Sequence, residues 1–272
     1  MMNDFCAVHI DESPWRILGT KETGQMWVLT NRLGSIYRFE PTRSGKIASE
    51  FLKNYEGAVV TDGFAGYNAL RKSDKIRVGH CWAHARREFF ERWDDYPEEC
   101  NEALDLIDLI FEMEASAKTF DELRLLRETD IKFVVERFYD WLMKTRPKFL
   151  PSEGISKAIA YALKFWPELT LFLKDLSVPI DNNEAERAIR HSVMGKKNFA
   201  GSKTINGADV AATLYTLIES AKKAGLQPRE YLKYIITERW HNREPLTPQR
   251  LAKEKYGAET KVKFPKRDCW KI

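Results

Sequence analysis

Two aspartates, far apart in the sequence, have the surroundings expected of metal ligands. Asp11 and Asp62 follow short apolar, β-rich runs, residues 7–10 and 57–61, and each precedes a turn signal. Strand ends place side chains at the rim of an α/β sheet, where ligands commonly bind. Two carboxylates there repel each other unless a cation lies between them, and Mg²⁺ suits such a site because it takes oxygen ligands and keeps several waters. The alternative for either aspartate alone is a turn cap.

A third acidic position lies in residues 181–190, which read Asp-Asn-Asn-Glu-Ala-Glu-Arg-Ala-Ile-Arg. The spacing of Ala185 and Ile189 predicts the inward face of a helix. Glu186 borders that face, whereas Glu184, two positions back, points elsewhere. Both glutamates are also residue types that the helix dipole favours in a first turn. The spacing favours Glu186 over Glu184 as a ligand.

Cys81 and His84 have the Cys-x-x-His spacing that is found in zinc sites. A structural zinc site usually needs four ligands, and no second pair lies nearby in the sequence. Packing is therefore the favoured role for Cys81 and its neighbour Trp82. We expect His84 and Arg87 to be more exposed, near the acidic site.

Basic and amide side chains gather in the residues that follow Glu186 in the sequence. Such side chains hold DNA phosphates in many complexes. The alternative is the solvated end of a helix. The residues are Arg187, Arg190, Lys196, Lys197 and Asn198.

The elements that position these residues change character along the chain. The first third is predicted to be mainly strands, with a hairpin turn at residues 31–34. The predicted strands are residues 7–10, 26–30, 35–39, 57–61 and 76–79. Helices are predicted at residues 44–55, with Ser44 as N-cap, and through Tyr67 and Leu70. From about residue 83 to residue 174 the apolar spacing is helical throughout, and Asp181 is expected to cap the helix through Ile189. Two further helices are predicted at residues 208–224 and 228–236.

Several motifs occur together in a fixed order, and together they resemble the catalytic domain of insertion-sequence-66 family transposases. They are His-Ile-Asp-Glu-Ser at 9–13, Thr-Asp-Gly-Phe at 61–64, Cys-Trp-Ala-His-Ala-Arg-Arg at 81–87, the acidic motif at 181–190, and Gly-Lys-Lys-Asn-Phe-Ala-Gly-Ser at 195–202. The resemblance extends to about Arg239. Their joint occurrence is far more specific than any one of them.

The resemblance implies an α/β, ribonuclease H-like mixed sheet flanked by helices, with a large all-helical insertion before the catalytic glutamate helix. It divides the chain into a first core part (1–82), the insertion (83–180), a second core part (181–240) and a basic C-terminal tail (241–272). It also implies a DDE triad of Asp11, Asp62 and Glu186 that is both catalytic and metal-binding.

The resemblance further implies an enzyme that cleaves and joins DNA with Mg²⁺ or Mn²⁺. Its partners would be the transposon ends and the target DNA, and it would act as a homo-oligomer on paired ends. The expected DNA contacts are His84, Arg87, Arg187, Arg190, Lys196, Lys197 and Asn198.

Composition is typical of a folded protein, with 43% hydrophobic and 12% aromatic residues in a chain of 272. The net charge of +4 is unevenly distributed: residues 88–140 hold 17 acidic and 6 basic side chains, whereas residues 222–272 hold 14 basic and 6 acidic. The basic end is expected either to lie on DNA phosphates or to be solvated. The four scattered cysteines, the absence of an apolar run of bilayer length and the lack of a visible signal peptide predict a cytoplasmic protein with no membrane partner.

Two other functions share parts of this pattern. One is a truncated, inactive transposase remnant that keeps the fold and DNA binding only, because ten residues precede Asp11 whereas the family generally carries a long N-terminal region. The other is a ribonuclease H-like nuclease acting on RNA–DNA hybrids, which explains the carboxylates but not the helical stretch or the Cys-Trp-Ala-His motif.

Overall fold

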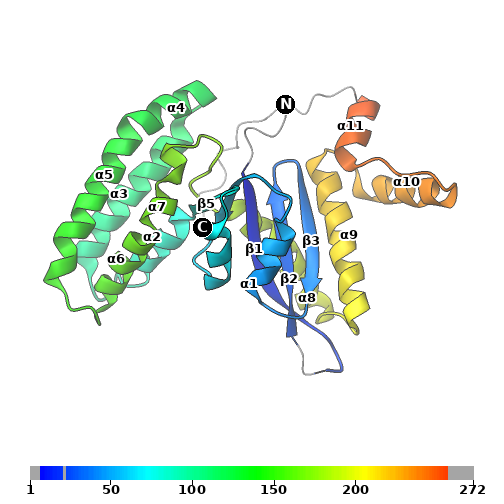
Figure 1. Ribbon diagram of the computed structural model, residues 1–272, viewed down its shortest axis with the longest axis horizontal. Coiled ribbons are helices and arrows are strands. Elements are labelled where there is room, and N and C mark those ends of the chain that lie inside the picture. Colours follow the sequence, from blue (N-terminus) through cyan, green and yellow to red (C-terminus); the bar gives the residue numbers. More distant parts are fainter. Residues whose placement is uncertain (1–6, 21–22, 257–272) are drawn as a thin grey trace.

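The computed structural model describes residues 7–20 and 23–256, and a five-stranded mixed sheet lies at its centre (Figure 1). The strand order is β3-β2-β1-β4-β5. The β3–β2 and β2–β1 pairs are antiparallel, whereas the β1–β4 and β4–β5 pairs are parallel. All five predicted strands are present, so the α/β class is confirmed. The strands are β1 (Val8–Arg16), β2 (Thr23–Asn31), β3 (Gly34–Glu40), β4 (Gly57–Thr61) and β5 (Ile76–His80).

The first strand differs from its prediction because it does not end at Asp11. It continues to Arg16, and Asp11 pairs with Val28 of β2 in the middle of the strand. Polar residues in β1 obscured its length in the sequence, since the apolar run stops at Ile10. Pro14 is tolerated because the paired positions with β4 are Val8 and His9, which leaves that side of the later strand as an edge.

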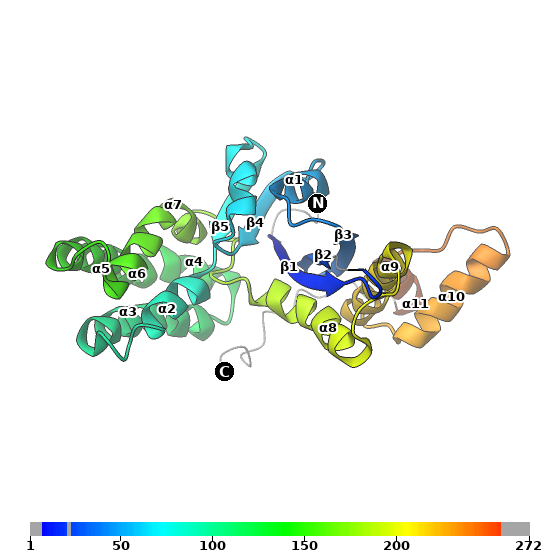
Figure 2. The ribbon, with the colours of Figure 1, turned by 90° about the horizontal axis from the view of Figure 1, so that it is seen from below.

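Helices cover both faces of the sheet (Figure 2). Ile10, Trp27 and Val59 alternate onto the face covered by α1 (Gly45–Phe51) and the 3-10 helix η1 (Ala65–Lys72). Ser44 caps α1 as predicted, and its side chain accepts a hydrogen bond from the backbone N–H of Lys46. The opposite face packs against α8 (Asn183–Phe199) and α9 (Ile205–Lys223) through side chains that include Trp15, Val28 and Tyr37. The sheet is therefore the middle of three layers.

A group of helices, which we call the helical lobe, lies beside β5 and follows it in the sequence (Figure 1). The helical prediction for residues 83–174 is confirmed. Its elements are α2 (Trp82–Phe90), α3 (Pro97–Ser116), α4 (Phe120–Glu128), α5 (Asp130–Thr145), η2 (Arg146–Lys148), α6 (Gly154–Lys164), α7 (Trp166–Leu169) and η3 (Leu171–Leu173).

Trp82 joins the helical lobe to the sheet. Its ring is fully buried, lies against Phe138 and Phe172, and donates from Nε1 to the carbonyl of Leu169 at 2.8 Å. The same hydrophobic cluster includes Val60 of β4, so the lobe and this end of the sheet share one core. The packing role predicted for Cys81 and Trp82 agrees with their complete burial.

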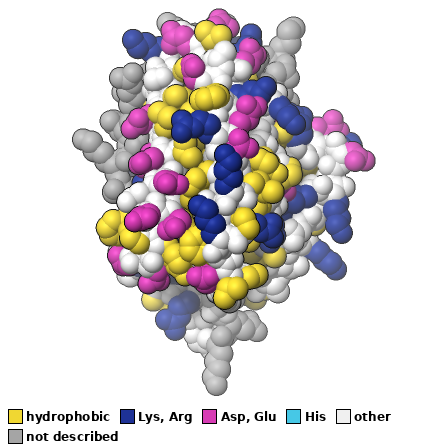
Figure 3. Space-filling model, turned by 90° about the vertical axis from the view of Figure 1, so that its left-hand side faces the viewer, with side chains coloured by type: hydrophobic (Ala, Val, Ile, Leu, Met, Phe, Trp, Pro, Cys, Tyr) yellow, Lys and Arg dark blue, Asp and Glu magenta, His cyan; other side chains and the backbone are white. Residues whose placement is uncertain are grey.

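The outer surface of the helical lobe carries both signs of charge. Figure 3 shows a row of positive side chains down the middle of this face, with acidic and hydrophobic side chains around it. Exposed residues of α5 include Lys132, Arg137 and Lys144. The acidic excess of residues 88–140 therefore does not produce a continuous negative surface.

Two helices follow α9, namely α10 (Pro228–Trp240) and α11 (Pro248–Tyr256). The start of the predicted basic tail is folded, because Ala252 of α11 is buried together with Ala221 and Leu226. Residues 257–272 of that tail lie outside the described residues. Within the described part of the chain, no helix is long and apolar enough to cross a bilayer.

Replacing Trp82 with alanine should weaken the shared core. We expect Trp82→Ala to lower the free energy of unfolding by about 3–5 kcal/mol, because the cavity lies among packed aromatic rings. Trp240→Ala is the matched control, since Trp240 is 83% exposed and its loss should change stability by no more than about 0.5 kcal/mol. Denaturant unfolding of both variants measures the difference, and equal effects would contradict a central role for Trp82.

Candidate active site

The register of the sheet brings the two aspartates together. Val8 pairs with Val59 and His9 pairs with Val60 in the parallel ladder between β1 and β4. Continuing the same register by two residues puts Asp11 level with Asp62, just beyond the end of β4. Since side chains alternate along a strand, both aspartates face the side of the sheet that α8 covers. The predicted proximity therefore holds, although Asp11 lies within its strand and not at the strand's end.

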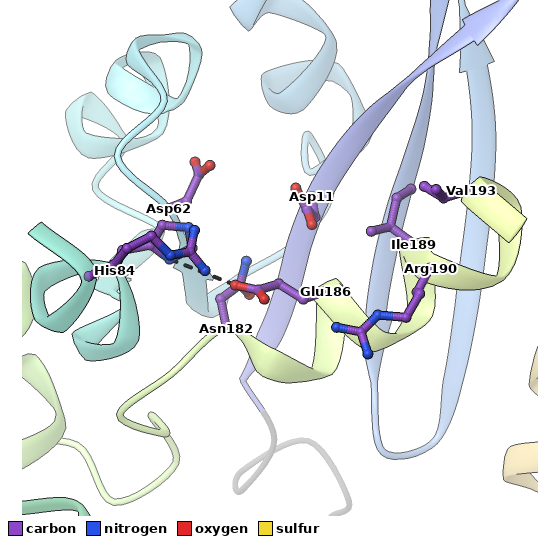
Figure 4. A pocket seen from close by; sticks show the side chains of 9 residues that line it. Asp11, Asp62, His84, Asn182, Glu186, Ile189, Arg190 and Val193 are labelled. Carbon is purple, nitrogen blue, oxygen red and sulfur yellow. Dashed lines mark ion pairs between the residues drawn. The ribbon is translucent and has the colours of Figure 1, made fainter. Parts of the chain in front are cut away.

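The helix α8 brings Glu186 to the same place. It begins one residue later than predicted, with Asn182 as its N-cap, and continues to Phe199. Asp181 accepts the N–H of Asn183 at 2.9 Å beside this cap. Glu186 lies in the first turn, and in Figure 4 its side chain extends from α8 toward His84.

Asn182 fixes this helix to two other elements. Its side-chain N–H donates to the carbonyl of Ile10 at 3.1 Å, and its oxygen accepts from the ring Nδ1 of His9 at 3.1 Å. Its backbone N–H donates to the sulfur of Cys81, also at 3.1 Å. Asn182 is 1% exposed, so these bonds are made away from water. The start of α8 is thereby held against β1 and against the start of α2.

One pocket contains all three acidic residues (Figure 4). Its volume is about 320 Å³, and it opens between the sheet, α2 and α8. Both acidic and basic side chains line it. The lining residues are Asp11, Asp62, His84, Arg87, Asn182, Glu186, Ile189, Arg190 and Val193.

The acidic crowding is strongest at Asp11. Burial, together with the negative charges of Glu12, Asp62 and Glu186, raises the pKa of this carboxyl to about 8, against the backbone N–H of Glu12, which lowers it. A carboxylate in this position is costly without a nearby positive charge. Asp62 accepts the N–H of Phe64 at 2.9 Å, which orients its carboxyl at the start of η1.

Two neighbouring glutamates are turned away from the pocket. Glu12 points to the other face of the sheet, where Arg43 pairs with it at 2.6 Å and the hydroxyl of Tyr67 donates to it. Glu184 accepts from Lys223 of α9 at 2.7 Å. Glu186, and not Glu184, is thus the glutamate of α8 that lines the pocket.

The residues predicted to contact DNA divide into two groups. His84, Arg87 and Arg190 line the pocket. The other four lie outside it on α8, where Arg187, Lys197 and Asn198 are exposed and Lys196 donates to the carbonyl of Pro14 at 2.7 Å. Lys197 lies on the same side of α8 as Glu186, about 16 Å further along the axis.

The ligand atoms of the three acidic residues do not form one tight cluster. Among the described residues, one group of three His, Cys, Asp or Glu side chains has ligand atoms all within 4.8 Å of one another, and it consists of Cys81, His84 and Glu186. His84 Nδ1 lies 3.8 Å from Glu186 Oε1. Glu186 therefore lies between the aspartate side of the pocket and the Cys-x-x-His motif.

The sequence of this chain is similar to that of known proteins. The model of a family described as Transposase IS66 family matches residues 4–210. The chain belongs to this transposase family. Two relatives from Sinorhizobium fredii, both named as uncharacterized proteins, are y4hP, 30% identical over 244 residues, and y4jD, 26% identical over 243 residues.

The similarity to these relatives covers 79% and 85% of this IS66-family chain but 44% of each relative. The chain thus spans less than half the length of the curated relatives it matches. The resemblance stated from the motifs is confirmed at the level of the family.

The role of Asn182 is not visible in the sequence of this IS66-family chain. The residue stands inside the quoted acidic motif, but its type and spacing give no sign of three hydrogen bonds to distant segments. His9, its partner in the first motif, was missed for the same reason. A buried amide of this kind is visible in sequence only as a polar residue beside a helix start.

Removing the Asn182 side chain should loosen the pocket. We expect Asn182→Ala to lower the free energy of unfolding by about 2–4 kcal/mol, because the Ile10 carbonyl and the His9 ring lose their buried partner. Asn183→Ala is the control, since the hydrogen bond given for Asn183 at this site comes from its backbone. If denaturant unfolding shows the two variants to be equally stable, Asn182 does not hold α8 in place.

The raised pKa of Asp11 predicts a pH-dependent stability of the metal-free protein. Between its ordinary value of 3.8 and about 8, the folded protein keeps a proton that the unfolded chain releases. Stability should therefore fall as pH rises through this window. Asp11→Asn removes the titrating group, so in a chelating buffer the variant should gain stability relative to wild type between about pH 5 and pH 8. The stability of Asp209→Asn, at an exposed position on α9, should vary with pH as that of wild type does. If the pH profile of Asp11→Asn is also parallel to that of wild type, the pKa of Asp11 is not raised.

Proposed function

We propose that this chain is the catalytic core of a DDE transposase, with Asp11, Asp62 and Glu186 as its metal-binding carboxylates. The observation that supports this most is their convergence in one pocket from β1, the end of β4 and the first turn of α8. These segments are more than a hundred residues apart at the extremes. Arg87 and Arg190, which line the same pocket, suit a phosphodiester substrate.

The residues present fit a hard divalent cation. Asp11 and Asp62 offer carboxylate oxygens, the ligand type that Mg²⁺ and Mn²⁺ prefer. Burial and the neighbouring carboxylates raise the pKa of Asp11 to about 8, so a bound cation would stabilise its ionised form. When bound, a pair of such ions activates the attacking oxygen and stabilises the leaving oxygen. Glu186 would complete the ligand set, although its carboxyl lies close to His84 and does not form a tight cluster with the two aspartates.

The cationic residues would hold the DNA strand. His84 and Arg87 on α2 and Arg190 on α8 lie beside the acidic groups, so they can pair with the phosphate that is cleaved and with its neighbour. Lys197, on the same side of α8, would bind the strand further along. The remaining predicted contacts are Arg187, Lys196 and Asn198, which would bind from the flanks of that helix.

The fold supports the same assignment. We propose that the mixed sheet with α1, η1, α8 and α9 is a ribonuclease H-like core, and that residues 83–180 are an insertion into it. The insertion leaves the core directly after β5 and returns directly before α8. Assembly into a homo-oligomer on paired DNA ends is part of this proposal.

Single substitutions of the three acidic residues test the assignment. We expect Asp62→Asn, Asp11→Asn and Glu186→Gln each to reduce Mg²⁺-dependent cleavage and joining of DNA that carries the element's ends by at least about a hundredfold, because each removes a direct metal ligand. Glu184→Gln is the matched control on the same helix turn and should retain most of the activity. Gel analysis of end-labelled DNA measures cleavage and joining.

The protein in its complete encoded form should be used, and each outcome separates the candidate functions. Cleavage by wild type that survives Asp62→Asn would show that the catalytic assignment is wrong. Salt-dependent DNA binding without cleavage by wild type would favour a remnant that only binds DNA. Cleavage of RNA–DNA hybrids in preference to DNA ends would favour a ribonuclease.

A further inference from the structure

In the folded chain, a glutamate lies beside the cysteine and histidine of the Cys-x-x-His motif. Cys81 is the N-cap of α2, and His84 lies one turn into that helix on the same side. Glu186 comes from α8, more than a hundred residues later. The ligand atoms of the three side chains all lie within 4.8 Å of one another. The sequence shows only two neighbouring ligands, Cys81 and His84, whereas the fold brings Glu186 beside them as a third.

Two of these ligand atoms are buried without a hydrogen-bond partner. They are Nδ1 of His84 and Oε1 of Glu186, which face each other at 3.8 Å. Buried polar atoms are nearly always satisfied, so an unsatisfied pair suggests a missing ligand. The separation is longer than a hydrogen bond but is suited to two atoms that share a metal ion.

The donor set identifies the kind of ion. Thiolate, imidazole and carboxylate are the three protein ligands of zinc, and three of them leave a fourth position open to water or a substrate oxygen. Magnesium does not suit a thiol or an imidazole. The aspartates offer oxygens alone, so the two halves of the pocket differ in the ion that they prefer.

We propose that Cys81, His84 and Glu186 form a binding site for Zn²⁺, and that zinc bound there withdraws Glu186 from the magnesium ligands. The first part stands on the cluster itself, and the second rests on the proposed function of Glu186. Binding converts the Cys81 thiol to a thiolate, and the proton passes to solvent. Zinc would then inhibit a reaction that magnesium supports.

Cobalt substitution tests the site without any assay of activity. Co²⁺ takes up zinc sites, and a thiolate ligand gives it a charge-transfer absorption in the near ultraviolet. We expect the intact wild-type protein to show this band, Cys81→Ser to lose it, and Cys100→Ser to keep it. Cys100 is the matched control, because it is also a buried free thiol but lies in α3. Serine can still accept the N–H of Asn182, so Cys81→Ser should keep the fold, which circular dichroism and thermal unfolding will check.

The remaining two ligands supply independent variants. Zn²⁺ affinity, measured by competition with a chromophoric chelator, should fall at least about a hundredfold in His84→Asn and in Glu186→Gln, since even outer-shell changes cost about 10–100-fold. Asp62→Asn should leave both the band and the affinity unchanged. Absence of the band in wild type, or its persistence in Cys81→Ser, would overturn the proposal.

The inhibitory part has its own measurement. A low concentration of Zn²⁺, added to a magnesium-supported reaction, should inhibit DNA cleavage by wild type and by Cys100→Ser equally. Cys81→Ser should need at least about tenfold more Zn²⁺ for the same inhibition. Equal inhibition of all three would refute withdrawal of Glu186. Since the cobalt band does not depend on cleavage, failure of the proposed transposase activity and failure of the zinc site remain distinguishable.

Discussion

The geometry of the pocket depends on the hydrogen bonds of one buried amide. Asn182 connects the strand that carries Asp11, the start of the helix that carries His84, and the helix that carries Glu186. Each bond is modest by itself, but the alternative is an unsatisfied polar group in a dry interior. Breaking any of these hydrogen bonds would therefore disturb the arrangement of the acidic residues. A flexible connection at this point would let repulsion among the carboxylates push α8 away from the sheet.

The carboxylates that line the pocket repel one another. Asp11, Asp62 and Glu186 raise one another's energy, and burial increases that cost. The surrounding fold supplies the compensation through the cores on both faces of the sheet and through Asn182. Neighbouring acids that are not needed are neutralised elsewhere, Glu12 by Arg43 and Glu184 by Lys223. Asp11, Asp62 and Glu186 are the acidic side chains that remain together in the pocket.

Much of this arrangement was predictable from local patterns. Alternating apolar runs predicted the strands, and Asn31-Arg32-Leu33-Gly34 predicted the hairpin, where the Asn31 side chain accepts the N–H of Gly34. The motifs identified the family and the pocket residues. The length of β1 was not predictable, because Glu12 is polar and its partner Arg43 comes from a different segment. Nor were the bonds of Asn182 or the approach of Cys81 to Glu186, since both depend on contacts across a hundred residues of chain.

The two ends of the helical lobe are bonded to each other where they meet the sheet. The N–H of Trp82 donates to the carbonyl of Ile180 at 2.8 Å, and Asn182 donates to Cys81 across a separation of 101 residues. The chain thus leaves and re-enters through a closed neck. A segment joined through such a neck can change in length while the surroundings of Asp11 and Glu186 stay fixed. The lobe is therefore the part of this molecule whose length can change with the least effect on the pocket.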